Sequence, residues 1–198
     1  MTRNPIQQVS NKLQYRAIGI IYGIYTPLND KNINKGSIKD KNGTILDTVV
    51  LGKNIPLIRK YIDLKKNYYW IVYPRNKNTD NLHLQIAGIW DPENLNNEAG
   101  NVSRNNEELL NLLNLRDNFF SIRGKLVYVN AQAKEVTIKI KSSNKNNKQN
   151  NNSFKISLKG EISMDSINSF VSIDTIREGN TLNLTSYEVV EGKSFENN

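Results

Sequence analysis

Positive side chains in the C-terminal part of the chain recur at every second position along three predicted strands. In a strand, alternate side chains point to opposite faces of the sheet, so these cations should share the outer face. Such a face can replace the counterions condensed on nucleic-acid phosphates, which gives affinity with little sequence preference. The six cations are Arg123, Lys125, Lys139, Lys141, Lys155 and Lys159.

The opposite face of the same strands should fill the core. Its expected members are Phe120, Ile122, Leu126 and Tyr128, then Val136, Ile138 and Ile140, then Phe154, Ile156 and Leu158. A plain solvated surface in a lysine-rich protein is the competing explanation for the cations, since lysine on exposed strands also blocks aggregation. The loop 142–153 adds Lys145 and Lys148 as candidate phosphate contacts, or is a tolerated low-complexity insertion.

A second candidate group lies in the N-terminal part, where aromatic residues adjoin a basic turn. Exposed aromatic rings beside cations are the stacking platforms of single-strand binders. Ordinary packing in a core is the alternative for any one ring. The members are Tyr69 and Tyr73 on one strand face, Arg75 and Lys77 in the following loop, and His83 and Gln85 on the outer face of the next strand.

The sequence contains few residues that could support catalysis. The chain has no Cys and one His, which excludes thiol nucleophiles, disulfides and multi-histidine metal sites. Neither a phosphate-binding glycine loop nor a nucleophile-elbow motif is present. We therefore predict a non-catalytic protein without a cofactor or a metal. The missing Cys fits a reducing cytoplasm, and we expect no membrane partner.

The net charge of +8 is unevenly distributed. Residues 1–92 carry +8 and contain no Glu, residues 93–118 carry −3, and residues 119–198 carry +3. Codon bias toward Asn, Lys and Ile raises the number of lysines, but it does not readily explain this asymmetry. A basic half of this kind indicates an anionic partner.

The predicted strands and helices that carry these residues occur in the same order in two successive parts of the chain. Strand-like runs, a turn at Lys41-Asn42-Gly43 and a helical stretch at 55–64 predict three strands, a helix and two strands in residues 14–92. Residues 119–191 repeat the order, with 164–173 ambiguous between helix and strand. The order is that of the OB-fold, so we predict a mainly β protein of two tandem five-stranded OB-like barrels. We expect flexible ends at 1–13 and 192–198.

Between the predicted barrels, residues 93–118 read as an acidic linker ending in a short helix. Asn105 with Glu108 resembles a capping box, and the apolar stripe comprises Leu109, Leu112 and Leu113. This stripe could dock a protein partner. The alternative function is accordingly a protein–protein adaptor built on OB-like domains.

Three stretches, LQYRAIGIIYGIYTP, YYWIVYPR and LHLQIAGIWDPE, also resemble a conserved family of cyanobacterial proteins. The resemblance implies a source and no activity. Residue pattern and charge lead us to predict a single-stranded nucleic-acid-binding protein, for RNA or DNA, that acts mainly through phosphate contacts with some aromatic stacking.

Overall fold

The computed structural model describes residues 4–76, 81–92, 105–141 and 152–192. These residues divide into two compact units. Unit 1 comprises Met1–Gln7, Gly19–Tyr73 and Leu84–Phe119, and unit 2 comprises Gln8–Ile18, Pro74–His83 and Phe120–Asn198. No helix in the described residues is long and apolar enough to cross a membrane.

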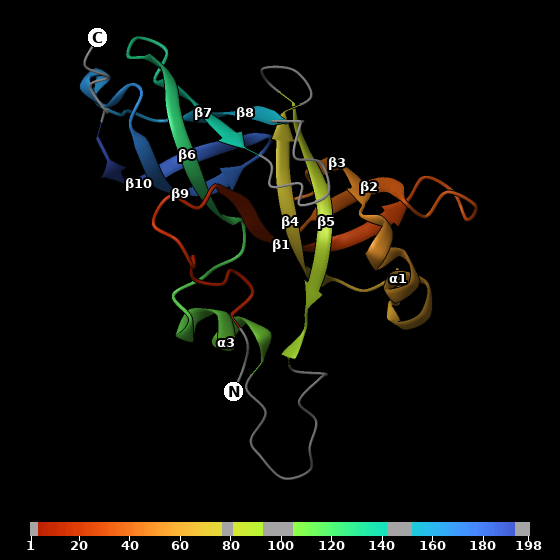
Figure 1. The fold of residues 1–198 in the computed structure, drawn as a ribbon. Coiled ribbons are helices and arrows are strands. Elements are labelled where there is room, and N and C mark those ends of the chain that lie inside the picture. The colour runs from red at the N-terminus through yellow and green to blue at the C-terminus, as the bar shows by residue number, and fades with distance from the viewer. Residues whose placement is uncertain (1–3, 77–80, 93–104, 142–151, 193–198) are drawn as a thin grey trace. The chain divides into compact units, whose positions relative to one another are not determined.

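Among the described residues, the part of the chain that forms the first barrel contains five strands and the helices α1 and α3 (Figure 1). The strands are β1 (Arg16–Pro27), β2 (Lys35–Asp40), β3 (Ile45–Val50), β4 (Tyr68–Asn76) and β5 (Leu82–Trp90). The 3-10 turn η1 (Gly52–Asn54) leads into α1 (Ile55–Tyr61), and α3 (Asn106–Leu112) follows β5. The helix expected over 55–64 thus exists but ends at Tyr61, and Pro56 stands in its first turn.

The strands of unit 1 close into a barrel in the order β1-β2-β3-β5-β4, with β4 pairing back to β1. All pairs with printed registers are antiparallel except β3 with β5, which run parallel. This is the topology of the OB-fold, as the order of elements predicts. The barrel core includes Ile38, Leu46, Trp70 and Ile86, each at most 1% exposed.

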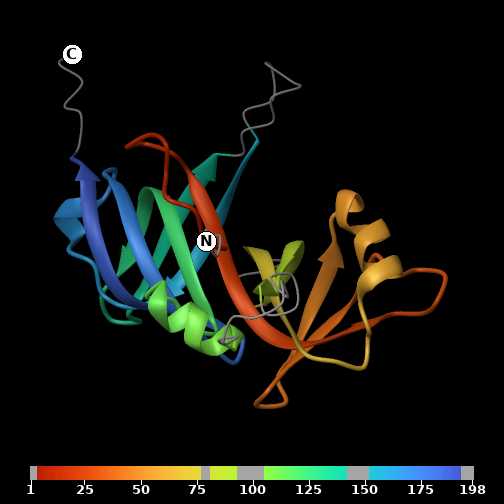
Figure 2. The same cartoon turned by 90° about the horizontal axis from the view of Figure 1, so that it is seen from below.

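Unit 2 repeats the topology with β6 (Phe119–Asn130), β7 (Glu135–Lys141), β8 (Ser153–Lys159), β9 (Phe170–Glu178) and β10 (Thr181–Glu191). The barrel closes through β6 and β9, and β8 runs parallel to β10. Figure 2 shows these strands, in green and blue, curving together. The ambiguous stretch 164–173 forms the 3-10 turn η2 (Met164–Ser166) and the start of β9.

One glycine in the first strand of each barrel explains how that strand bends around its neighbour. A Cβ at Gly23 would lie 2.5 Å from the backbone oxygen of Lys39 on β2. A Cβ at Gly124 would lie 2.5 Å from the backbone oxygen of Lys139 on β7. Both distances are too short for any side chain, so both positions require glycine.

Alternation assigns the core of unit 2 correctly except at Phe154, which is half-buried, and at the end of β6. Phe120, Ile122 and Leu126 are fully buried, but Tyr128 is 50% exposed. The ladder between β6 and β7 shifts register between Leu126 and Tyr128, which marks a β-bulge. An extra residue in one strand moves every later side chain to the other face. The prediction that Tyr128 points into the barrel is therefore wrong.

Candidate nucleic-acid interface

Three lysines form a row across three neighbouring strands of unit 2. Lys125 on β6 is the direct cross-strand partner of Lys139 on β7, and Lys139 is the partner of Lys155 on β8. Lys125 and Lys155 are exposed and Lys139 is half-buried. Within the described ranges none of the three forms a salt bridge. We call these residues the lysine row.

Three other lysines on or beside these strands have a partner in the structure. Lys159 is opposite Glu135 in the β7–β8 ladder, with 3.3 Å between Lys159 Nζ and Glu135 Oε1. Lys134 Nζ lies 2.9 Å from Glu161 Oε1, and this contact raises the pKa of Lys134. Lys141 Nζ lies 5.7 Å from the centre of the Tyr15 ring. The lysine row therefore differs from its surroundings in its uncompensated charge.

Like charges placed directly opposite each other weaken a sheet. The row contains two such pairs in succession, while the next lysine on β8 has an acidic partner. A solvated surface with no binding role would be more stable if positive and negative side chains alternated across the ladder. An anion bound over the row would remove the repulsion, and a chain of phosphates supplies anions at regular spacing.

An exposed aromatic ring stands on the same sheet face as the row. Tyr128 is the cross-strand partner of Thr137, and Thr137 lies two residues before Lys139 on β7. Alternation places Thr137 and Lys139 on one face, so Tyr128 joins them. Tyr128 Oη accepts a hydrogen bond from Asn130 Nδ2 at 3.3 Å. The sequence gives no signal for this ring, because the bulge is invisible in the pattern of apolar residues.

Arg123 does not belong to the open surface, which corrects the prediction that it stands outside with the lysines. Its side chain is 8% exposed. It donates to Ser172 Oγ at 2.6 Å and to the backbone oxygen of Lys12 at 2.7 Å. The physical reason is the segment Gln8–Ile18, which packs in unit 2 and covers this part of β6. Arg123 thus joins the N-terminal segment to the barrel.

Tyr69 is likewise not an exposed stacking residue. It is 7% exposed, and its ring centre lies 4.7 Å from that of Tyr22 and 5.9 Å from that of Trp90. Burial, with the nearby carboxylates of Asp117 and Glu107, raises the pKa of Tyr69 to about 12. The phenol therefore stays protonated at neutral pH.

The remaining predicted contacts of the N-terminal part are scattered. Arg75 belongs to unit 2, where its Cζ lies 3.9 Å from the ring centre of Phe154. Tyr73, His83 and Gln85 are half-buried on β4 and β5. Lys77 lies outside the described residues, as do Lys145 and Lys148 of the loop. A binding role for these seven residues stays a prediction.

Helix α3 begins where the sequence predicts, with Asn105 Oδ1 accepting from the backbone N–H of Glu108 at 2.9 Å. The residues that it buries differ from the predicted stripe. Leu110 is 1% exposed and Leu115 is 8% exposed, whereas Leu112 is 60% exposed. Leu109 and Leu113 are half-buried. Because the helix uses its apolar face within unit 1, a protein partner on Leu109, Leu112 and Leu113 is not supported.

Each unit carries the closed barrel of an OB-fold, a class that binds oligonucleotides and oligosaccharides on its strand surface. Comparison with protein families identifies the group. Residues 17–97 match the family described as PatR RNA-binding protein, N-terminal OB-fold domain. Residues 122–191 match the cyanobacterial OB-fold-like RNA-binding domain, C-terminal. The chain belongs to this cyanobacterial family of OB-fold proteins, and the two RNA-binding domains support nucleic-acid binding. No curated protein matches the chain.

Proposed function

We propose that the chain binds single-stranded RNA through phosphate contacts on the β6–β7–β8 face of unit 2. The observation that carries the proposal is the lysine row, in which Lys125, Lys139 and Lys155 stand in register with no acidic neighbour across the ladder. Such a row supports binding that depends little on base sequence and strongly on salt.

Tyr128 supplies the second component of the proposed interface. A base that stacks on its exposed ring would leave the sugar-phosphate chain free to follow the lysine row along the same face. Stacking on one aromatic ring contributes about 1–3 kcal/mol per base and tolerates every base. The combination favours a single strand over a duplex, whose bases already stack on each other.

The experiment is fluorescence anisotropy with a labelled single-stranded RNA, comparing two doubly substituted proteins. Lys125→Gln with Lys155→Gln removes both exposed ends of the row. Lys134→Gln with Lys159→Gln removes the same positive charge from lysines that already have carboxylate partners. We expect the first protein to bind on the order of tenfold more weakly, with the slope of log K against log salt reduced by about 1.4.

The control protein should stay within about twofold of the natural chain at the same salt concentration. Equal losses in the two proteins would mean that only the total charge matters, and the lysine row would then not be the interface. Binding that is indifferent to salt would contradict phosphate contacts altogether.

A further inference from the structure

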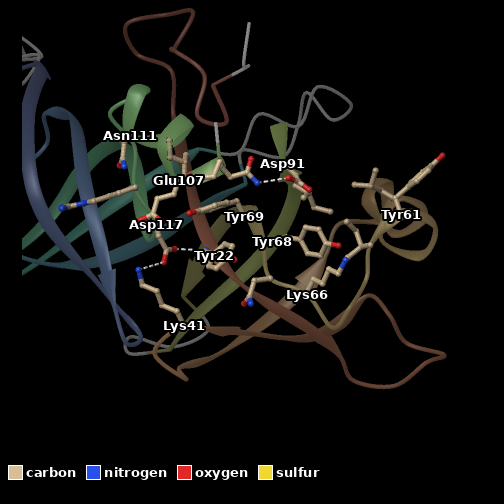
Figure 3. A pocket seen from close by; sticks show the side chains of 18 residues that line it. Tyr22, Lys41, Tyr61, Lys66, Tyr68, Tyr69, Asp91, Glu107, Asn111 and Asp117 are labelled. Carbon is tan, nitrogen blue, oxygen red and sulfur yellow. Dashed lines mark hydrogen bonds and ion pairs between the residues drawn. The ribbon is translucent and has the colours of Figure 1, made fainter. Parts of the chain in front are cut away.

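Unit 1 contains a pocket of about 970 Å³ outside its barrel core (Figure 3). Its walls come from β1, β4, α1 and α3, with Lys41 contributed by the turn between β2 and β3. The volume lies in the range of sites that hold small organic ligands. None of the lysine row lines it.

One wall of the pocket is formed by tyrosine rings in fixed positions. Tyr22 packs on Tyr69, and Tyr68 packs edge-on against Trp70 at 5.8 Å between ring centres. The backbone N–H of Asp63 donates to Tyr68 Oη at 3.2 Å, which further fixes that ring. On α1, Tyr61 is 67% exposed and lines the same pocket. The wall is suited to a flat aromatic group.

The charged groups of the pocket are three cations, Lys41, Lys66 and Arg116, and three carboxylates, with asparagine side chains between them. Lys41 and Lys66 have side chains that are 60% and 70% exposed, as expected for cations at a rim. Lys66 Nζ lies 3.9 Å from Asp63 Oδ2, an exposed contact that a phosphate can displace. The carboxylates of Asp91, Glu107 and Asp117 also line it. Asp117 is held in place, because the backbone N–H of Tyr22 donates to its Oδ1 at 2.8 Å and Lys41 Nζ lies 3.5 Å from its Oδ2.

These features select the chemistry of a ligand. A lipid or an apolar peptide would remove water from the charged groups without forming any new polar contact to them, which is costly. A simple anion would use the lysines and be repelled by the carboxylates. A ligand with a flat ring, N–H donors on that ring and an anionic group at one end would match the rings, the carboxylates and the lysines together.

We propose that this pocket binds one nucleotide, with its base against the tyrosines and its phosphate toward Lys66 at the rim. The carboxylates favour bases that carry an exocyclic amino group, so adenine should bind better than uracil. Where the nucleotide is part of a strand, the inference rests on the RNA binding proposed above. Where it is a free mononucleotide, the inference stands by itself.

The protein contains its own reporter for this site. Both tryptophans lie in unit 1, and each contacts a tyrosine of the pocket, Trp70 with Tyr68 and Trp90 with Tyr69. Tryptophan fluorescence of the full chain can therefore be titrated with AMP and, separately, with UMP. We expect saturable binding of AMP and binding of UMP that is weaker by about threefold or more.

Two neighbouring lysines provide a matched pair of variants. Lys66 lines the pocket and Lys65, which is also exposed, does not. Lys66→Gln should weaken AMP binding by about fivefold while Lys65→Gln changes it by less than twofold. Tyr61→Ala removes an exposed ring without cost to the core and should weaken AMP binding by about threefold or more. Equal effects of Lys65→Gln and Lys66→Gln would overturn the proposal.

Titration with a labelled RNA separates this inference from the proposed function. If AMP binds and RNA does not, the pocket stands and the RNA interface fails. If AMP does not bind but Lys66→Gln weakens RNA binding and Lys65→Gln does not, the pocket takes its nucleotide only from a strand. A third result would overturn the proposal: RNA binds, AMP does not change the tryptophan fluorescence, and Lys66→Gln does not change RNA binding. The pocket then does not bind nucleotides.

Discussion

Lys125 and Lys139 face each other directly across the ladder between β6 and β7. Lys139 has a second lysine, Lys155, on its other side. Lys139, the middle residue of the row, is therefore repelled by two neighbours. Removing the charge of Lys139 should make the folded state more stable.

We predict that Lys139→Gln raises the free energy of unfolding of unit 2 by about 0.5 kcal/mol at low salt, because it removes two like-charge pairs. The same substitution should weaken RNA binding. Urea denaturation and anisotropy on one protein sample measure both effects. Salt screens exposed charges, so the gain in stability should shrink as salt is added.

Lys159→Gln is the control for the predicted gain in stability. It breaks the pair with Glu135 and should lower stability by about 0.2–1 kcal/mol. A lower stability of Lys139→Gln at every salt concentration would show that the row does not strain the sheet.

Tyr128 offers a test of stacking. Tyr128→Ala should weaken binding of single-stranded RNA by about 1–3 kcal/mol, whereas Tyr128→Phe keeps the ring and should bind nearly as the natural chain does. Tyr187 on β10 is 41% exposed, so Tyr187→Ala serves as the matched loss of an exposed ring. Equal losses for Tyr128→Ala and Tyr187→Ala would remove the special role of Tyr128.

The sequence predicts the two barrels because their strand order, their hairpin turns and their alternating apolar residues all follow local rules. The turn at Lys41-Asn42-Gly43 is predicted correctly for the same reason. What it misses depends on contacts between distant segments. Arg123 is covered by a segment more than a hundred residues earlier. Tyr128 is exposed because one extra residue interrupts the ladder.

The tyrosine pocket has the same kind of explanation. The β1–β4 ladder brings Tyr22 beside Tyr68 and Tyr69, and Asp117, which follows α3, reaches the same place from much later in the chain. Alternation places Tyr69 and Tyr73 together on one face of β4, but it cannot show that Tyr22 and Trp90 pack against Tyr69 and leave it buried.

Arg123 and Lys125 lie two residues apart on β6, but the structure predicts that substituting Arg123 destabilises the fold and that substituting Lys125 does not. Arg123→Gln removes two hydrogen bonds from a charged buried group and should lower the free energy of unfolding by about 2–3 kcal/mol. Lys125→Gln replaces an exposed side chain and should change it by less than about 0.5 kcal/mol. Urea denaturation compares the two. Unchanged stability of Arg123→Gln combined with weakened RNA binding would restore Arg123 to the interface.

Gly23 and Gly124 provide a way to perturb one barrel at a time. At either position alanine would force its Cβ against the backbone oxygen of the neighbouring strand. Each substitution should cost about 1–3 kcal/mol. Tryptophan fluorescence reports on unit 1 and should follow Gly23→Ala more than Gly124→Ala. Identical unfolding curves for the two variants would mean that the barrels unfold as one.

Alkaline pH should weaken unit 1 through two buried tyrosines. Burial raises the pKa of Tyr25 and of Tyr69 from 10.0 to about 12. Tyr25 is fully buried and its hydroxyl donates to the backbone oxygen of Ile33 at 2.8 Å. Because a phenolate is charged, the folded chain retains both protons at a pH where the unfolded chain has released them. The unfolded state then binds fewer protons, so stability falls as pH rises.

The free energy of unfolding of unit 1 should therefore be independent of the ionisation of these groups below pH 10, where their stabilising contribution is fully present, and should decline between pH 10 and about 12. Urea denaturation followed by tryptophan fluorescence at several pH values measures the slope. Tyr69→Phe removes one of the two ionisable hydroxyl groups and should make the decline of stability with pH shallower. Tyr61→Phe changes an exposed ring and should leave the slope as it is. A decline that Tyr69→Phe does not alter would show that Tyr69 ionises alike in the folded and unfolded chain.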